Sequence, residues 1–185
     1  MLPLVSNVIP AIAMWVYGVV FFVIAFYGFG KVDAKGVGIV AAVGGVMNVI
    51  FAMILIGASL IGFYTGGLVE PVAMVGLVTA LLVFHFGIPA LTVGFGNLFG
   101  VIPRGASFAA IFIGIFILLY IPFFMSHGMF WFAANCLLWS WVIFSFLLVV
   151  FGKLNPKVMA WSFLILSFVT CFIPAGILFL GAPLP

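Results

Sequence analysis

Charge is nearly absent from this sequence. Its 185 residues include five Lys and Arg and two Asp and Glu, so that 4% are charged, and the mean hydropathy is +1.60. Soluble globular domains carry about 25% charged residues. The scarcity of charge therefore excludes a soluble domain and indicates an integral membrane protein. Because the cations are divided among three short segments, we expect no basic surface that binds nucleic acid.

Groups that perform catalysis or bind metals are equally scarce. The two acids, Asp33 and Glu70, lie in turns that we expect on opposite sides of the membrane, and the two histidines, His85 and His127, belong to different predicted helices or turns. No His or Cys spacing resembles a metal site. Catalysis needs several convergent polar groups. The sequence thus predicts neither an enzyme nor a bound metal ion or other cofactor.

What the chain does contain is long apolar runs separated by short turns. A helix needs about 20 apolar residues to cross about 30 Å of hydrocarbon, and the runs here have room for about six. We therefore predict one all-α integral membrane domain over residues 1–185 with six transmembrane helices. Their expected ranges are 10–30, 37–61, 71–96, 105–124, 130–151 and 157–180.

Local signals mark several helix ends. Asp33 and Asn155 can each accept a hydrogen bond from a backbone N–H at a helix start. Pro71 and Pro156 fit a first helical turn, where the backbone N–H has no partner in any case. Inside the third helix, Pro89 predicts a kink or a wide spot because proline removes one backbone hydrogen bond.

The second predicted helix is rich in glycine. The spacing from Ala41 to Gly45 has the small-xxx-small form that lets two helix backbones approach closely in lipid, so we expect an interior helix. Asn48 is its one strongly polar residue. Its amide either packs against a neighbouring helix or lines a pore, and the sequence leaves both interpretations open.

The cations set an expected orientation. All of them fall in three turns, at 30–36, 100–104 and 152–157. Cytoplasmic loops hold the excess of Lys and Arg, so these turns should be cytoplasmic and both termini outside. Each turn also combines a glycine, spacers, a turn residue and a cation, which suggests three successive hairpins around a narrow pore. Chance similarity of general turn signals is the alternative.

Several stretches occur in an order that identifies a family. They are Gly-Lys-Val-Asp-Ala-Lys at 30–35, Val43-Gly44-Gly45 with Asn48, Asn97-Leu98-Phe99-Gly100 with Arg104-Gly105, Gly152-Lys153, and Ile173-Pro174-Ala175. Together they resemble the AmiS/UreI family of small channels for urea and short-chain amides. The resemblance implies a six-helix protomer with its own pore, outward termini, a homohexameric ring and the cytoplasmic membrane of a prokaryote.

The resemblance also places candidate pore residues on the third and sixth helices. The acid found on the sixth helix of the family's urea channel falls at Leu166, and Leu91 stands where an aromatic side chain is expected. The third helix also offers Phe84 and His85. An ionisable group inside a membrane helix is a functional candidate. A neutral histidine that hydrogen-bonds a neighbouring helix is the alternative for His85.

On the fifth helix, Trp139 and Trp141 represent the aromatic pore pattern that the resemblance implies. Trp131, Asn135 and Trp139 recur every four residues and therefore share one helix face. Trp139 and Trp141 lie about 200° apart around the helix, so only one can face a given lumen, and either remains a candidate. Flat aromatic walls with an occasional amide suit a small neutral planar solute. Packing or lipid-facing aromatics are the alternative in a chain with 18% aromatic residues.

These patterns predict a passive channel, in a lipid bilayer, for small neutral amides such as urea, acetamide or formamide. An apolar lumen excludes ions, because a charge at the bilayer centre costs about 2.5–3.5 kcal/mol or more. One alternative is a proton-coupled secondary transporter of a small weak acid or amide, with His85 or Glu70 as the protonated group. Another is a structural or regulatory membrane subunit. The candidate pore residues are Asn48, Phe84, His85, Leu91, Trp131, Asn135, Trp139, Trp141 and Leu166.

Overall fold

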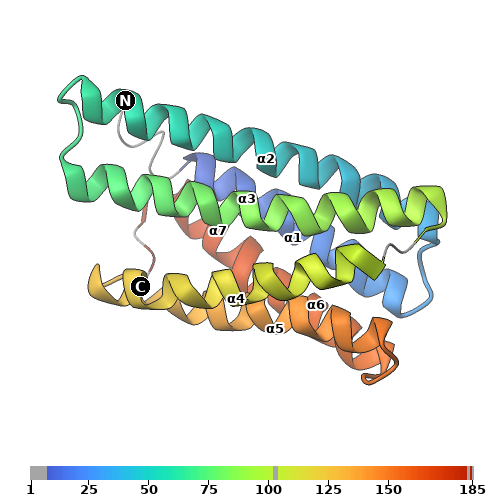
Figure 1. Ribbon diagram of the computed structural model, residues 1–185. Helices are drawn as coiled ribbons and strands as arrows, with labels where there is room; N and C mark the ends of the chain where they lie inside the picture. The colour runs from blue at the N-terminus through green and yellow to red at the C-terminus, as the bar shows by residue number, and fades with distance from the viewer. Residues whose placement is uncertain (1–7, 102–103, 183, 185) are drawn as a thin grey trace.

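The protein is an elongated helical bundle in the computed structural model, which describes residues 8–101, 104–182 and 184, without the side chains of residues 104–109 (Figure 1). The turn expected at 100–104 is therefore described only in part, and residues 102–103 lie outside the description. The elements are α1 (Ile9–Gly28), α2 (Ala34–Tyr64), α3 (Glu70–Phe99), α4 (Arg104–Ser126), α5 (Phe130–Val150), α6 (Pro156–Leu166), the π-helical turn η2 (Ser167–Phe172) and α7 (Ile173–Phe179).

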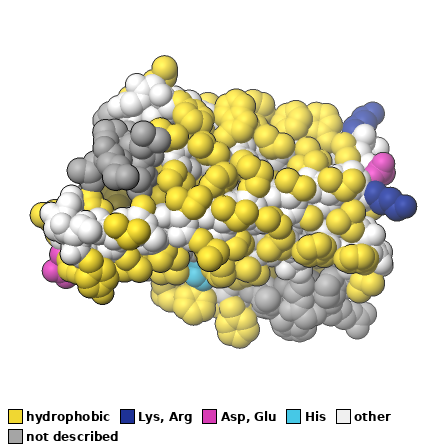
Figure 2. Space-filling model, turned by 90° about the horizontal axis from the view of Figure 1, so that it is seen from above, with side chains coloured by type: hydrophobic (Ala, Val, Ile, Leu, Met, Phe, Trp, Pro, Cys, Tyr) yellow, Lys and Arg dark blue, Asp and Glu magenta, His cyan; other side chains and the backbone are white. Residues whose placement is uncertain are grey.

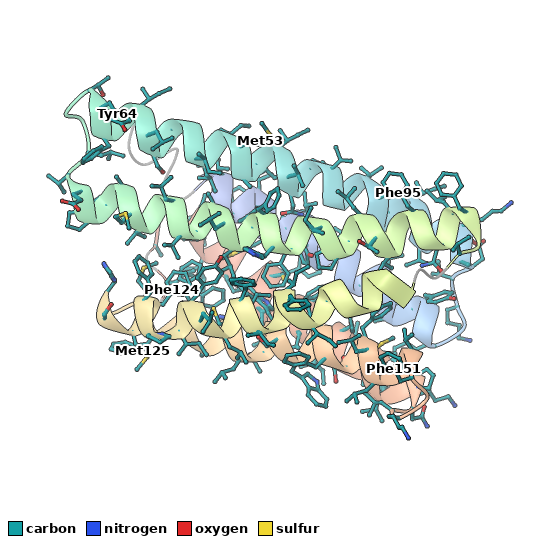
Figure 3. All side chains as sticks on the ribbon, viewed as in Figure 1. Met53, Tyr64, Phe95, Phe124, Met125 and Phe151 are labelled. Atoms are coloured by element: carbon teal, nitrogen blue, oxygen red, sulfur yellow. The ribbon has the colours of Figure 1, made fainter. Side chains whose placement is uncertain are left out.

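The surface of the bundle is that of a multi-pass membrane protein. Figure 2 shows hydrophobic side chains over most of the described face, with charged side chains at the two ends. Four helices, α1, α2, α3 and α5, are long and apolar enough to cross a membrane, as is the continuous run from Pro156 to Phe179. The described apolar part of α4, Ala110–Ser126, is shorter. Met53 on the outside is 66% exposed, whereas Phe124 points into the bundle and is buried (Figure 3).

Helix starts follow the local signals in the sequence. The Asp33 carboxylate accepts a hydrogen bond from the backbone N–H of Gly36 at 2.6 Å, and the Asn155 side-chain oxygen accepts one from the N–H of Lys157 at 2.9 Å. Both predicted caps are therefore confirmed. Proline occupies the first turn of α1, α3 and α6, where it removes no helical hydrogen bond.

A glycine in the left-handed conformation terminates most of the helices, at both ends of the bundle. A glycine with a φ between +67° and +75° follows each of α1, α2, α3, α4, α5 and α7. This left-handed conformation lets the last backbone carbonyls find partners without a Cβ clash. The glycines are Gly30, Gly66, Gly100, Gly128, Gly152 and Gly181. Helix termination accounts for the glycine that the three cation-bearing turns share, so that glycine is no evidence for a threefold repeat.

The helices pack in pairs that differ from the expected hairpins. The most extensive contacts are between α2 and α3 and between α4 and α5, while α1 packs against α2 and against the continuous run α6, η2 and α7. By contrast, α3 makes few contacts with α4, and α5 makes few with α6. Among the described residues, the helices on either side of the turns at 100–104 and 152–157 thus pack less extensively with each other than with other helices, and the arrangement as three hairpins around a pore is not confirmed.

Glycine explains why α2 prefers α3. Gly38 and Gly45 on α2 face Gly94 and Gly87 on α3, and a Cβ added at any of them would lie within 3.1 Å of the other backbone. Such close approach strengthens packing in lipid, where no hydrophobic force draws helices together. The opposite face of α2 is exposed at Met53 and several other apolar residues. Within this chain α2 is thus not enclosed on all sides, as an interior helix would be: Gly38 and Gly45 approach α3, Gly44 approaches Val20 of α1, and the remaining face is exposed.

Candidate pore site

A wide and a narrow cavity lie between the helices, each lined by described residues. The wide cavity has a volume of about 690 Å³ and lies near the end that carries the turns at 30–36 and 152–157, with Val37, Asn97 and Pro156 in its wall. Pro89 also lines it, at the predicted wide spot, although α3 continues as one helix through this proline. The narrow cavity has a volume of about 30 Å³, which is space for about two water molecules.

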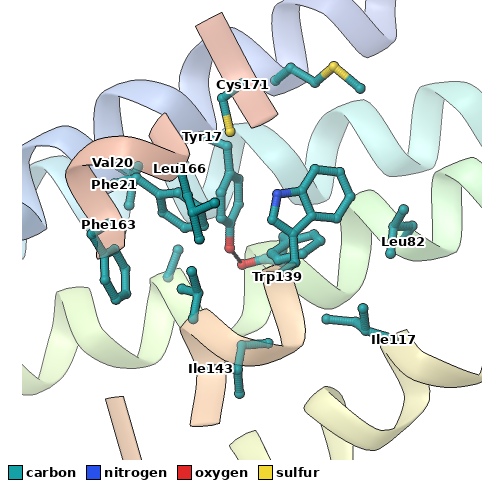
Figure 4. Close-up of a cluster of buried hydrophobic side chains, with 14 of the residues drawn as sticks. Tyr17, Val20, Phe21, Leu82, Ile117, Trp139, Ile143, Phe163, Leu166 and Cys171 are labelled. Atoms are coloured by element: carbon teal, nitrogen blue, oxygen red, sulfur yellow. Dashed lines mark hydrogen bonds between the residues drawn. The ribbon is translucent and has the colours of Figure 1, made fainter. Parts of the chain in front are cut away.

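Two aromatic residues line both cavities and therefore mark where they meet. They are Tyr17 of α1 and Phe86 of α3. The Tyr17 hydroxyl donates a hydrogen bond to the backbone carbonyl of Phe86, and the two rings meet edge to face with centroids 4.8 Å apart. Trp139 of α5 meets Phe86 in the same manner at 4.7 Å. We call Tyr17, Phe86 and Trp139 the aromatic constriction. Figure 4 labels Tyr17 and Trp139 among the buried side chains around it.

The constriction holds two residues that sequence reasoning did not select. Phe86 carries no polar atom that would distinguish it from the other phenylalanines. Tyr17 is 7% exposed and lies near the middle of α1. A hydroxyl placed mid-helix in an apolar run is the signal that would have identified it, because a buried Tyr O–H needs a hydrogen-bond partner.

Asn48 lies in the wall of the narrow cavity. Its side chain is 1% exposed, and its Nδ2 donates to the backbone carbonyl of Gly44 on its own helix at 2.9 Å. Thr79 of α3 and Cys171 of η2 line the same cavity. The amide thus donates within α2 rather than to a neighbouring helix, and its side chain borders the narrow cavity, so pore lining by Asn48 stays a prediction.

The tryptophans of α5 separate as the helical geometry requires. Trp139 is buried beside the narrow cavity, and its Nε1–H donates to Thr170 Oγ1 at 2.9 Å. Trp141 is 43% exposed, and its Nε1–H donates to Ser162 Oγ at 3.2 Å on the outer side of the bundle. Of the two candidates, the structure places Trp139 at a cavity.

Asn135 and Trp131 lie on the same face of α5 as Trp139, one turn and two turns before it. The rings of Trp131 and Trp139 are nearly perpendicular, with centroids 6.4 Å apart. Asn135 is 2% exposed and donates from Nδ2 to the carbonyl of Trp131 at 2.7 Å, while its Oδ1 is a buried acceptor without a hydrogen-bond partner. The stripe predicted from sequence therefore lies against the constriction, although Trp131 and Asn135 border neither cavity.

Phe84 and His85 lie away from both cavities. Phe84 is exposed, and His85 is half-buried where α3 meets α4. The His85 Nδ1 lies 2.7 Å from the carbonyl of Leu81 and 3.1 Å from the hydroxyl of Tyr120. This is the hydrogen-bonded arrangement that the sequence offered as the alternative to pore lining.

Leu91 and Leu166 are packing residues in the structure. Leu91 contacts the position where a Cβ of Gly45 would stand, so it belongs to the close α2–α3 contact. Leu166 is buried in the core, and its carbonyl accepts a hydrogen bond from the Thr170 hydroxyl at 2.7 Å. Neither side chain borders the two cavities.

The walls of both cavities are uncharged. None of the described residues that line them is Asp, Glu, Lys, Arg or His. Thr92 and Asn97 are polar, but each donates to the backbone of its own helix, at 2.9 Å in both cases. Within the described ranges, no three His, Cys, Asp or Glu side chains lie close enough together to hold a metal ion.

Comparison with known proteins agrees with this architecture. The fold is similar to the cryo-EM structure of the Helicobacter pylori urea channel in its closed state, with a TM-score of 0.76 and 19% sequence identity over 92% of this chain and 97% of that chain. No curated protein matches the sequence. The sequence model described as AmiS/UreI family transporter matches residues 9–182. The chain therefore belongs to the AmiS/UreI family, as its order of sequence landmarks predicted.

Proposed function

We propose that this protein is a passive membrane channel for small neutral amides such as urea, acetamide or formamide. The observation that carries the proposal is the aromatic constriction of Tyr17, Phe86 and Trp139, which separates an uncharged wide cavity from a narrow one. Membership of the AmiS/UreI family supports it. A solute that crosses the protein through these cavities passes between aromatic rings.

The chemistry of the walls favours a neutral solute over an ion. A charge near the bilayer centre costs about 2.5–3.5 kcal/mol or more, and the cavity walls offer no opposite charge that offsets this cost. A flat amide slides between ring edges and exchanges hydrogen bonds with the side chains of Asn48 and Thr79 in the narrow cavity. Because these polar groups are few, the solute is released as readily as it is bound.

Permeation requires the constriction to open. The narrow cavity has space for only about two water molecules. Beside it, the hydrogen bond from the Tyr17 hydroxyl to the Phe86 carbonyl joins α1 to α3. Rotation of Tyr17 or Phe86 joins the two cavities. The unpartnered Oδ1 of Asn135, one turn from Trp139, then offers a further acceptor for an amide N–H. We propose Tyr17, Asn48, Phe86, Trp131, Asn135 and Trp139 as the residues that act on the solute.

The orientation follows from the cations. We propose that the wide cavity opens toward the cytoplasm, because Lys31, Lys35, Lys153 and Lys157 lie in turns at that end. Both termini are then outside, in the cytoplasmic membrane of a prokaryote. The homohexamer is carried over from the family resemblance. Labelling of Lys35→Cys and Thr65→Cys by a membrane-impermeant maleimide in intact cells tests the orientation, and labelling of Lys35→Cys alone would reverse it.

Solute uptake tests the function. Proteoliposomes are mixed with hyperosmotic urea or acetamide at two pH values, and the recovery of their volume is followed by light scattering. We expect recovery faster than in empty liposomes, linear in solute concentration and independent of a proton gradient. Recovery equal to that of empty liposomes contradicts the proposal. Recovery that saturates and requires a proton gradient identifies the proton-coupled transporter instead.

A further inference from the structure

One polar contact holds the indole of Trp139. The indole Nε1–H donates to Thr170 Oγ1 at 2.9 Å, and the Thr170 hydroxyl itself lies 2.7 Å from the carbonyl of Leu166, to which it donates. With its proton committed to its own helix, the hydroxyl oxygen is free to accept from the indole. We propose that Thr170 is a positioning residue: it fixes the orientation of Trp139 at the aromatic constriction and thereby sets which neutral solutes pass.

The backbone around Thr170 brings this hydroxyl to the indole. Thr170 lies within η2, where the N–H of Ile173 bonds to the carbonyl of Phe168, and Pro174 follows without an N–H of its own. A π-turn adds one residue and so rotates the preceding segment by about 100° relative to the following one. The result is that Thr170 is fully buried while Cys171, its neighbour, lines the narrow cavity. Turns of this kind are rare and occur frequently at functional sites.

The contact reaches the constriction through the ring of Trp139. That ring packs against Phe86 at a centroid distance of 4.7 Å, and the carbonyl of Phe86 accepts the Tyr17 hydroxyl. A change in the tilt of the indole therefore changes the gap against Phe86, which is the gap a solute has to cross. Thr170 does not line either cavity, so it acts on the solute only through Trp139.

A second tryptophan and hydroxyl pair provides a matched control. Trp141 donates from Nε1 to Ser162 Oγ at 3.2 Å, and Ser162 donates to the carbonyl of Val158 at 3.1 Å. The pair joins the same two segments, α5 and the run that begins with α6, by the same chemistry. Neither residue borders a cavity. Ser162→Ala thus removes an equivalent hydrogen bond away from the constriction.

The inference rests on the proposed channel function, and its test compares relative permeabilities. Urea, acetamide and the bulkier isobutyramide are measured in proteoliposomes with wild type, Thr170→Val, Thr170→Ser and Ser162→Ala. Loss of one hydrogen bond corresponds to about a two- to tenfold change, and we expect a change of this size in the permeability ratios of Thr170→Val. Thr170→Ser, which keeps the hydroxyl, and Ser162→Ala should keep the wild-type ratios.

A double-mutant cycle separates positioning from a general structural role. Trp139→Phe keeps a ring but removes the N–H donor, so Thr170→Val should have no additional effect on the ratios in that background. Near-ultraviolet circular dichroism of the purified proteins should follow the same pattern. Wild-type ratios in Thr170→Val, or an effect of this variant that persists beside Trp139→Phe, overturn the inference. If Thr170→Val does not fold, Trp139→Phe alone should shift the ratios, and unchanged ratios there overturn it equally.

These measurements also show whether the channel function or the positioning role of Thr170 is wrong. If wild type conducts none of the solutes, the proposed function fails and the selectivity role of Thr170 fails with it. The circular dichroism cycle then decides whether Thr170 orients the indole at all. If wild type conducts and Thr170→Val leaves the ratios and the spectrum unchanged, the channel function stands and the inference about Thr170 is wrong.

Discussion

The hydroxyl of Tyr17 donates a hydrogen bond to the backbone carbonyl of Phe86, 69 residues away in the chain. The bond joins α1 to α3, two helices that otherwise make few contacts with each other. It lies where the wide and narrow cavities meet. One hydroxyl therefore connects the two helices at the constriction of the proposed solute path.

Removal of that hydroxyl should ease permeation. Tyr17→Phe keeps the ring but loses the bond to Phe86, so the two rings separate more readily. We expect urea flux to rise by about two- to tenfold, the range that corresponds to one hydrogen bond. Stopped-flow light scattering on proteoliposomes of equal protein content measures the change. Flux that stays at the wild-type level or falls would show that the bond does not restrain the passage.

The close contact between α2 and α3 should be intolerant of a methyl group. A Cβ at Gly94 would lie 2.4 Å from the backbone nitrogen of Ala42, so Gly94→Ala forces the helices apart. We expect a loss of about 1–3 kcal/mol in stability, the usual cost of overpacking. Thermal unfolding in detergent measures it. Gly57→Ala on α2 is the control, because no atom lies within 4 Å of its added Cβ, and an equal loss there would contradict the explanation.

Asn48 should support permeation through its position in the narrow cavity. Asn48→Leu fills this space of about 30 Å³ with an apolar side chain and removes a group that exchanges hydrogen bonds with the solute. We expect urea and acetamide flux to fall by about tenfold, which corresponds to one lost polar contact and the narrower path. Ser145→Ala is the comparison, since Ser145 is buried and bonds only to the carbonyl of Val142 on its own helix. Unchanged flux in Asn48→Leu would remove Asn48 from the proposed path.

His85 should be dispensable for flux. It lies between α3 and α4, bonded to the Leu81 carbonyl and the Tyr120 hydroxyl, and it borders neither cavity. His85→Gln keeps hydrogen-bonding capacity but cannot carry a proton. Uptake of urea at pH 5.5 and pH 7.5 should match wild type within about twofold at both values, since no part of the proposed path changes. Loss of uptake, or loss of a pH dependence present in wild type, would favour the proton-coupled transporter.

The sequence predicted best what local chemistry decides. Asp33 and Asn155 cap helices as expected because a cap needs only its own neighbours. The close pairing of α2 with α3 was missed because the turns do not reveal it: facing glycines such as Gly45 and Gly87 decide which backbones approach, and these contacts lie far apart in the chain.

For the candidate site, too, the sequence predicted local features but not contacts between helices. Helical spacing placed Trp131, Asn135 and Trp139 on one face, and Trp139 indeed lies at a cavity. Spacing alone could not choose between Trp139 and Trp141, which required knowing what surrounds α5. Tyr17 and Phe86 were missed because their importance arises from meeting across the bundle, and no pattern within either helix encodes that meeting.

The glycine contact between α2 and α3 has a mechanical consequence. Backbones that touch without intervening side chains leave no compressible layer, so the two helices move together. Phe86 belongs to one of them and Asn48 to the other. A tilt of α3 that moves the Phe86 ring out of the proposed path therefore also moves the Asn48 amide on α2. The two side chains change position together.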